Sequence, residues 1–242
     1  MPGPFEGHTC SAPAERSARM RDVILERVPR GKRLLILDVG CGTGVLAFTL
    51  AEALPDATVT GVDISAANIE TAETHRRSQA GGDRVRFMRA DYLQHDLSPV
   101  DVIVTDTVLH FMRARPIDLW AKLAGDLRPG GVLVCAMAYD CLHNRVLTGV
   151  RRALRAIRGR PVESLMMALG RLAYGRSMDE RLIRERIEYM FIPPEQVMSN
   201  ATESLTTSVG LRLIARHDLP GVSATQLKQR VSVFHKDLDA RG

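Results

Sequence analysis

From residue 34 to Ala138 the chain alternates short aliphatic runs with helical patterns, and this alternation restricts the possible folds more than any other feature. Parallel strands need long crossover connections, usually helices, so the pattern predicts a parallel β-sheet covered by helices. The run at 34–39 is typical of a buried strand, because it is continuously aliphatic, too short for a helix and followed by glycine. Further strands are predicted at 58–62, 84–89, 101–105 and 132–138, helices at 14–28, 45–54, 66–78 and 116–127, and a turn at 128–131.

Beyond Ala138 the pattern changes to helix alone before the strand signal returns. Within 141–202, helices are predicted at 146–157, 162–172 and 178–191, and no run is strand-like. Strand-like runs follow at 211–216 and 230–235, separated by Pro220-Gly221 and a polar stretch, as expected of an antiparallel pair at one sheet edge. We therefore predict one α/β domain over 1–242, with an N-terminal leader and helix at 1–30 and a helical insertion at 141–202 between strands five and six.

Composition places the chain among ordinary globular proteins, with 45% hydrophobic and 25% charged residues. Its four cysteines form no Cys-x-x-Cys pair, so no disulfide framework is expected and a cytoplasmic location is predicted. No apolar run reaches the roughly 18–20 residues of a transmembrane segment. Residues 1–16 lack the basic start and apolar core of a signal peptide, and we interpret them as a loose leader.

The basic charge is concentrated in one region of the chain. The net charge is +5, but residues 145–186 alone contain 11 arginines, no lysine and four acids. An enzyme that acts on nucleic acid more often carries basic residues around its active-site mouth. A nucleic-acid partner is therefore not expected.

A glycine-rich turn follows the first predicted strand, in the sequence Asp-Val-Gly-Cys-Gly-Thr-Gly at 38–44. Its glycines let a ligand approach the backbone at the positive end of the next helix. Dinucleotide-binding turns usually read Gly-x-Gly-x-x-Gly, whereas the spacing here is Gly-x-Gly-x-Gly. Two further acids, Asp63 and Asp91, follow the second and third predicted strands. A carboxylate at the position of Asp63 can accept both ribose hydroxyls of an adenosine.

Together these features resemble the class I S-adenosylmethionine-dependent methyltransferases. The resemblance covers about residues 34–138 and rests on the turn at 38–44, Asp63, Ala90-Asp91, the segment 101–112 and the Leu-Arg-Pro-Gly-Gly sequence at 127–131. It implies a Rossmann-like seven-stranded sheet, mostly parallel with an antiparallel edge strand and with helices on both faces. It also implies S-adenosylmethionine as the cofactor.

The resemblance further implies the parts of a cofactor site. The glycines would line the methionine and ribose end, Asp38 would lie near the methionine amino group, and Asp63 would bind the ribose hydroxyls. Asp91 would bind the adenine amino group, with Tyr92 beside the ring. The predicted cofactor-binding residues are Asp38, Gly40, Cys41, Gly42, Gly44, Asp63, Ile64, Asp91, Tyr92 and Thr105. The alternative is that the glycines form an ordinary tight turn and that the aspartates cap a helix and a turn.

Candidate acceptor-side residues follow strands four and five, because open α/β sheets bind ligands at the carboxyl ends of their strands. Methyl transfer requires the acceptor atom to lie in line with the methyl–sulfur bond, and a base is needed only when the acceptor loses a proton. His110, Tyr139 and His143 are the predicted catalytic residues, with His110 a possible base. The alternatives are a histidine packed at a helix start and polar residues that only form strand-end turns.

The acceptor is predicted to be a small molecule, methylated on O, N or C, with a biosynthetic pathway as the candidate setting. The tetrad Asn/Asp-Pro-Pro-Tyr/Phe of enzymes that methylate adenine or cytosine amino groups is replaced by Asp-Thr-Val-Leu at 106–109. The histidines show no metal-binding spacing, so no metal is expected. Methylation of RNA or protein and a nicotinamide-dependent oxidoreductase are the alternative functions, and the oligomeric state is left open between monomer and homodimer.

The helix predicted at 146–157 has an apolar face, and arginines cover the rest of its surface. The apolar face consists of Val146, Leu147, Val150, Leu154 and Ile157. Three interpretations of the arginines stay open: a solvated face of a lid helix, a clamp for an anionic acceptor, and a contact with anionic lipids.

The Asp63→Ala variant should lose most of its affinity for S-adenosylmethionine. Without the carboxylate, buried ribose hydroxyls would have no acceptor, at a cost of about 1–3 kcal/mol. Isothermal titration calorimetry measures this directly, and an unchanged affinity would contradict the assignment of Asp63.

Overall fold

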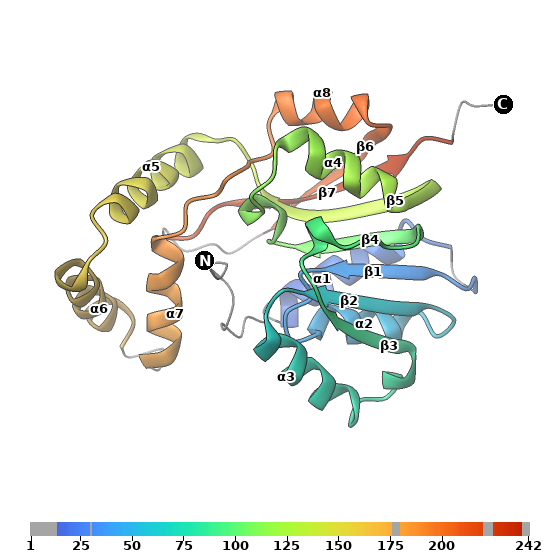
Figure 1. Ribbon diagram of the computed structural model, residues 1–242, viewed down its shortest axis with the longest axis horizontal. Coiled ribbons are helices and arrows are strands. Elements are labelled where there is room, and N and C mark those ends of the chain that lie inside the picture. Colours follow the sequence, from blue (N-terminus) through green and yellow to red (C-terminus); the bar gives the residue numbers. More distant parts are fainter. Residues whose placement is uncertain (1–13, 30, 176–179, 220–224, 239–242) are drawn as a thin grey trace.

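The computed structural model describes residues 14–29, 31–175, 180–219 and 225–238, and a seven-stranded sheet with the order β3-β2-β1-β4-β5-β7-β6 forms its centre (Figure 1). The strands are β1 (Leu35–Val39), β2 (Thr58–Asp63), β3 (Val85–Arg89), β4 (Val100–Asp106), β5 (Leu127–Ala138), β6 (Leu211–Asp218) and β7 (Gln229–Lys236). The α-helices are α1 (Ala14–Leu25), α2 (Val45–Ala53), α3 (Ala66–Arg76), α4 (Pro116–Gly125), α5 (Leu142–Ala156), α6 (Arg160–Tyr174), α7 (Glu180–Met190) and α8 (Asn200–Ser208).

The predicted mixed sheet is confirmed. β1 to β5 run parallel, whereas β7 runs antiparallel to both β5 and β6 and lies between them, so that β6 occupies the edge. β1 pairs with β4 as well as with β2, which makes β1 and β4 the point where the strand order reverses. Such a switch point leaves a crevice at the carboxyl ends of the two strands. The segments that follow β1 and β4 therefore meet at this edge.

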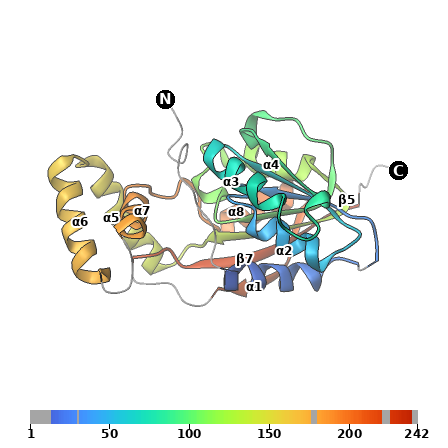
Figure 2. The same cartoon turned by 90° about the horizontal axis from the view of Figure 1, so that it is seen from below.

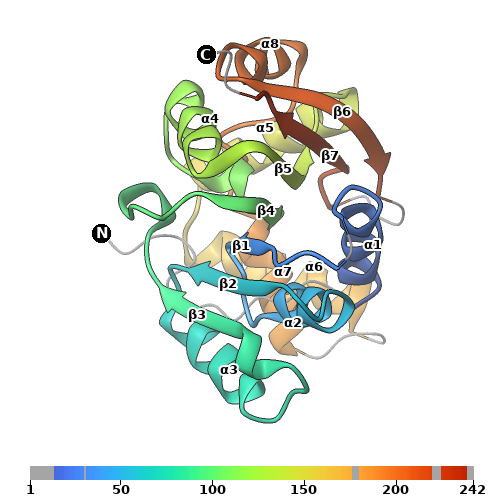
Figure 3. The ribbon, with the colours of Figure 1, turned by 90° about the vertical axis from the view of Figure 1, so that its right-hand side faces the viewer.

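Helices cover both faces of the sheet (Figure 3). A layer of buried side chains lies between the helices and the strands on each face. α1 and α2 pack against one face, where Met20, Ile24 and Leu50 contact aliphatic residues of the strands. α4 and α8 cover the other face, where Trp120 is fully buried with its ring centroid 5.5 Å from that of Phe234. α3 packs beside β2 and β3.

The start of β5 differs from the sequence prediction. The residues at 128–131 do not form a turn before the strand; they belong to β5, which begins at Leu127. β4 pairs Val100 with Leu127 but Val102 with Val132, so the extra residues of β5 bulge out of the ladder. Gly130 has a φ of 76° in this bulge, a conformation that glycine adopts without strain.

Three helices of the insertion, α5, α6 and α7, project beyond the carboxyl end of the sheet, at the left of Figures 1 and 2. α6 and α7 pack closely, because a Cβ at Gly170 would lie only 2.8 Å from Ile183 of α7. α8 belongs with the sheet, since it packs against α4 and β6. The limit predicted at residue 202 therefore falls inside the first turn of α8, which begins at Asn200.

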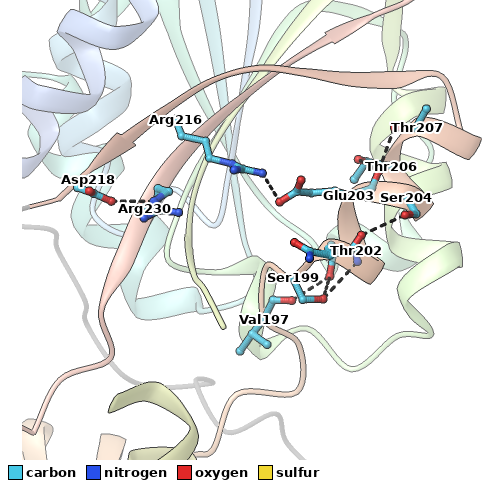
Figure 4. Close-up of polar contacts among 11 residues, drawn as sticks. Val197, Ser199, Thr202, Glu203, Ser204, Thr206, Thr207, Arg216, Asp218 and Arg230 are labelled. Carbon is cyan, nitrogen blue, oxygen red and sulfur yellow. Dashed lines mark hydrogen bonds and ion pairs between the residues drawn. The ribbon is translucent and has the colours of Figure 1, made fainter. Parts of the chain in front are cut away.

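Polar contacts fasten α8 and the edge of the sheet together (Figure 4). The Ser199 hydroxyl caps α8 by accepting a hydrogen bond from the Thr202 amide at 3.3 Å. Glu203 of α8 forms an ion pair with Arg216 of β6. Because α8 is bound to β6 in this way, the position of the chain that leads from α7 into α8 is fixed at its end.

Some predictions fall on residues outside the described part of the chain. These are the leader up to residue 13, the start of the helix predicted from Met178, and the Pro220-Gly221 turn. In the described ranges, no helix is both long and apolar enough to cross a membrane.

The Phe234→Ala variant should be less stable by about 3–5 kcal/mol, because it removes a fully buried aromatic ring and leaves a cavity beside Trp120. Trp120 is the single tryptophan of the chain, so its fluorescence reports urea unfolding. The Leu172→Ala control removes a side chain that is 86% exposed and should change stability by less than about 0.5 kcal/mol. Equal effects of the two substitutions would contradict the assigned core.

Candidate functional site

The glycine turn at 40–44 connects the carboxyl end of β1 to α2. Its three glycines have φ angles of 71°, 54° and 86°, in the left-handed region that glycine adopts without strain. The amides of Gly40 and Cys41 donate to the Val62 carbonyl oxygen at 2.7 and 3.1 Å, which holds the turn against β2. A Cβ at Gly40 would overlap the side chain of Val108, in the segment after β4. Glycine therefore allows the segments after β1 and β4 to approach closely.

Asp63, the last residue of β2, binds this turn through its side chain. Its Oδ2 accepts a hydrogen bond from the Gly42 amide at 2.9 Å. Its Oδ1 accepts from the Ser65 amide at 2.8 Å and from Asn68 Nδ2 at 3.2 Å. A carboxylate oxygen can accept about two hydrogen bonds, so Oδ2 keeps one acceptor position for a ligand hydroxyl. Ile64 follows as an exposed residue at the same edge.

The chain after β3 reaches the same place. The Ala90 amide donates to the Asp63 carbonyl oxygen at 3.0 Å, so Asp91 lies near the glycine turn. Asp91 is exposed, and its Oδ1 accepts the amide N–H two residues further on, at 3.0 Å. Tyr92 is buried in the core, and Lys122 Nζ lies 4.8 Å from its ring centroid. This burial does not favour the predicted place of Tyr92 beside an adenine ring.

Asp38 near the end of β1 is a buried acid whose Oδ2 has no hydrogen-bond partner among the described residues; it is 2% exposed. Burial, and then the charges of Asp106 and Asp63, raise its pKa to about 8. Thr105 at the end of β4 is also buried, with no partner for its hydroxyl in the described part of the chain. An ammonium group bound here would satisfy Asp38, so these residues fit the methionine end of the predicted cofactor. Burial, and then the charges of Asp38 and Asp63, raise the pKa of Cys41, which keeps its thiol protonated.

An ion pair that we did not predict connects α1 to the end of β4. Arg16 Nε donates to both carboxylate oxygens of Asp106, at 2.7 and 2.8 Å. Arg16 therefore belongs to α1, and the interpretation of residues 1–16 as a loose leader is wrong at this position. The next residue, Thr107, has a φ of 61°, which is strained for a threonine and is typical of functional sites. Arg16 and Asp106 are 90 positions apart in the sequence, so no local pattern could have predicted their contact.

His110 lies in the 3₁₀ turn Leu109–Phe111 after β4 and is 1% exposed. Its carbonyl oxygen accepts a hydrogen bond from the Glu195 amide at 2.8 Å, whereas its Nδ1 has no partner among the described residues. Burial, and then the charges of Arg151 and Arg16, lower its pKa to about 3. The imidazole is therefore neutral near pH 7 and is a weak base. This does not favour the predicted role as a base, but it suits a hydrogen bond to an acceptor.

The structure does not bring the other two predicted catalytic residues to His110. The Tyr139 ring lies under Arg230 of β7, with the guanidinium carbon 4.3 Å from the ring centroid. His143 Nε2 lies 2.9 Å from the carbonyl oxygen of Gln226. The first contact joins the residue after β5 to β7, and the second joins α5 to the segment before β7, so both support a structural role.

The face of α5 that is buried is not the apolar face predicted from the sequence. Asn144, Leu147 and Arg151 are its buried residues, whereas Val146, Val150 and Ile157 are exposed. Asn144 explains this orientation, because its side chain binds the Tyr139 carbonyl oxygen at 2.6 Å and both backbone groups of Lys228 at 2.8 Å. The predicted grouping of Arg151 with the surface arginines is therefore wrong.

Most described arginines of the insertion lie on its surface, several of them in ion pairs. Arg145 pairs with Asp140, and Arg158 pairs with both Glu163 and Glu188. No group of three or more histidines, cysteines or acids in the described ranges could hold a metal ion.

A parallel sheet with a glycine turn after β1 and an acid at the end of β2 defines a nucleotide- or nucleoside-binding α/β protein. Comparison with known proteins shows what part of the chain is similar to. Residues 37–133 match the family described as a methyltransferase domain. A trans-aconitate 2-methyltransferase from Azoarcus sp. is 36% identical over 136 residues, which are 55% of this chain and 51% of that protein. A ubiquinone biosynthesis O-methyltransferase from Maricaulis maris is 36% identical over 123 residues, 48% of this chain and 47% of that protein.

The chain spans about half the length of the curated relatives it matches. Among solved structures, the magnesium protoporphyrin IX methyltransferase of Synechocystis, with S-adenosylhomocysteine bound, has a similar fold. The TM-score is 0.60 at 18% identity, over 93% of this chain and 83% of that one. Residues 37–133 thus match a methyltransferase domain, and the chain shares its fold with a methyltransferase solved with S-adenosylhomocysteine bound.

The Asp38→Asn variant of the cofactor-free protein should become more stable than the wild type as pH rises. The folded state keeps the Asp38 proton up to about pH 8, whereas the unfolded chain releases it near the ordinary pKa of 3.8. Stability of the wild type therefore falls between these values, by up to about 1.4 kcal/mol per pH unit from this group. Urea unfolding at about pH 5 and about pH 7.5 should show the advantage of the variant growing with pH.

The exposed Asp56→Asn substitution removes a surface carboxylate and is the matched control, measured at the same two pH values. If Asp38→Asn behaves in the same way, Asp38 is not held protonated in the folded state.

Proposed function

We propose that the protein transfers a methyl group from S-adenosylmethionine to a small-molecule acceptor bound between the carboxyl edge of the sheet and helices α5–α7. The observation that carries this proposal is the convergence of the glycine turn, Asp63 and Asp38 at the edge where His110 also lies. The loops after β1 and β4 approach closely there, with the Val108 side chain packed against Gly40.

The residues that hold the cofactor in this proposal are those with unused hydrogen-bonding capacity. Asp63 Oδ2 offers an acceptor position to a ribose hydroxyl, beside the Gly42 amide that it already binds. Asp38 offers a buried carboxylate to the methionine ammonium group. When bound, S-adenosylmethionine supplies a methyl group activated by its sulfonium sulfur.

The contribution of the chain to the reaction is to orient the acceptor and to exclude water. His110 supports this role as a neutral hydrogen-bonding group, because a pKa of about 3 makes it too weak to deprotonate an alcohol or amine. Helix α7 contributes to the same region, since the Tyr189 ring centroid lies 6.2 Å from that of Phe111. An acceptor atom that carries no proton at neutral pH fits these groups best.

The names of two relatives support a small acceptor. They describe methylation of trans-aconitate and a step of ubiquinone biosynthesis. We further propose that α5–α7 act as the lid that selects the acceptor. The cytoplasmic location and the choice between monomer and homodimer stay predictions; Cys41, Cys135 and Cys141 are free thiols in this fold.

Calorimetric titration with S-adenosylmethionine, S-adenosylhomocysteine and NADH tests the cofactor part of the proposal. Binding of the first two ligands and not of NADH is expected. Incubation with methyl-labelled S-adenosylmethionine and separate pools of metabolites, RNA and protein tests the acceptor part. Label transferred to RNA or protein alone would contradict a small-molecule acceptor.

A further inference from the structure

Arg151 of α5 is a buried cation with no acidic partner in the part of the chain that the structure describes. It is 4% exposed, and burial lowers its pKa to about 10. Its Nη1 and Nη2 donate to the carbonyl oxygens of Ile192 and Thr225 at 3.3 and 3.2 Å, which are long hydrogen bonds, and its Nε has no acceptor. Burying a charge without a counter-ion destabilises the fold. A residue needed only for hydrogen bonds to these two carbonyl oxygens would therefore be expected to be neutral.

The segment 192–195 contacts both this cation and His110. The charge of Arg151 acts on the His110 imidazole, and this short segment links the two residues: Ile192 accepts from Arg151, and the Glu195 amide donates to the His110 carbonyl oxygen. Arg151 Nε and His110 Nδ1 are both buried and both lack partners among the described residues. Two unsatisfied nitrogens from different elements thus border one segment at the carboxyl edge of the sheet.

The charge around this pair is positive. Arg16, the other guanidinium that acts on His110, is neutralised by its ion pair with Asp106. Glu195 lies within ion-pair distance of two other arginines, at 3.5 and 3.8 Å. In the described ranges no carboxylate forms an ion pair with Arg151, so its charge stays uncompensated.

We propose that Arg151 and His110 form an anion subsite that binds a carboxylate group of the methyl acceptor, an inference that rests on the proposed function. A carboxylate presents two oxygens in one plane, which match the planar guanidinium and a neutral imidazole N–H. It would give Arg151 Nε and His110 Nδ1 their missing partners and neutralise the buried charge. The acceptor class is therefore a small carboxylic acid.

The test uses protein saturated with S-adenosylhomocysteine and measures binding of succinate, citrate and benzoate by calorimetry. The neutral probes are succinamide and benzamide, and inorganic phosphate is a separate arm. At least one carboxylate should bind while its amide does not. Arg151→Gln should weaken that binding at least about tenfold, as expected from loss of a charge-assisted hydrogen bond. Arg151→Lys, which keeps the charge but not the fork, should weaken it less.

Arg152→Gln is the matched control, because Arg152 is exposed on the next position of α5 and should leave carboxylate binding unchanged. An unchanged affinity of Arg151→Gln for S-adenosylhomocysteine shows that this variant is folded. Equal loss in the two glutamine variants, tighter binding of phosphate than of any carboxylate, or no carboxylate binding at all would overturn the inference. Failure of the wild type to bind S-adenosylhomocysteine would instead overturn the proposed function.

Discussion

The hydrogen bond from the Gly42 amide to Asp63 Oδ2 is the contact on which the arrangement of the site depends. It joins the turn after β1 to the end of β2, and the amides of Gly40 and Cys41 reinforce it through the Val62 carbonyl oxygen. A turn fixed in this way holds its backbone at the positive end of α2, with the Val108 side chain packed against Gly40. The neighbouring acids and the segment after β4 are then held around one space.

Charge balance is the second organising feature of this edge. Asp38 is buried among other acids and stays protonated to about pH 8, while Arg16 neutralises Asp106. His110 is kept neutral, and no carboxylate of the described residues pairs with Arg151. The same edge thus offers the Asp38 side chain to a ligand ammonium group and the Arg151 guanidinium to a ligand carboxylate. Both groups are buried, so their preferences are strong because water screens them little.

Much of the fold could be predicted because local patterns were unambiguous. The aliphatic run before the glycine turn, the proline at the start of α4 and the Ser65 cap of α3 each determine a boundary by steric or hydrogen-bonding rules. Predictions failed where pairing or packing decides. The bulge at Gly130 depends on register with β4, and the orientation of α5 depends on Asn144 binding the backbone of Lys228. The place of Tyr92 beside an adenine ring stays a prediction, which its burial in the core next to Lys122 does not favour.

The sequence by itself determined the order of strands and helices, the glycine turn, the acids near the ends of β1 and β2 and the acid after β3, because spacing along the chain governs these features. Only the tertiary structure decided which charged groups share a site. Arg16 and Asp106 are 90 residues apart, and Arg151 and His110 come from different elements. Burial sets the pKa of Asp38 and His110, and burial is a property of the whole fold. No local pattern contains that information.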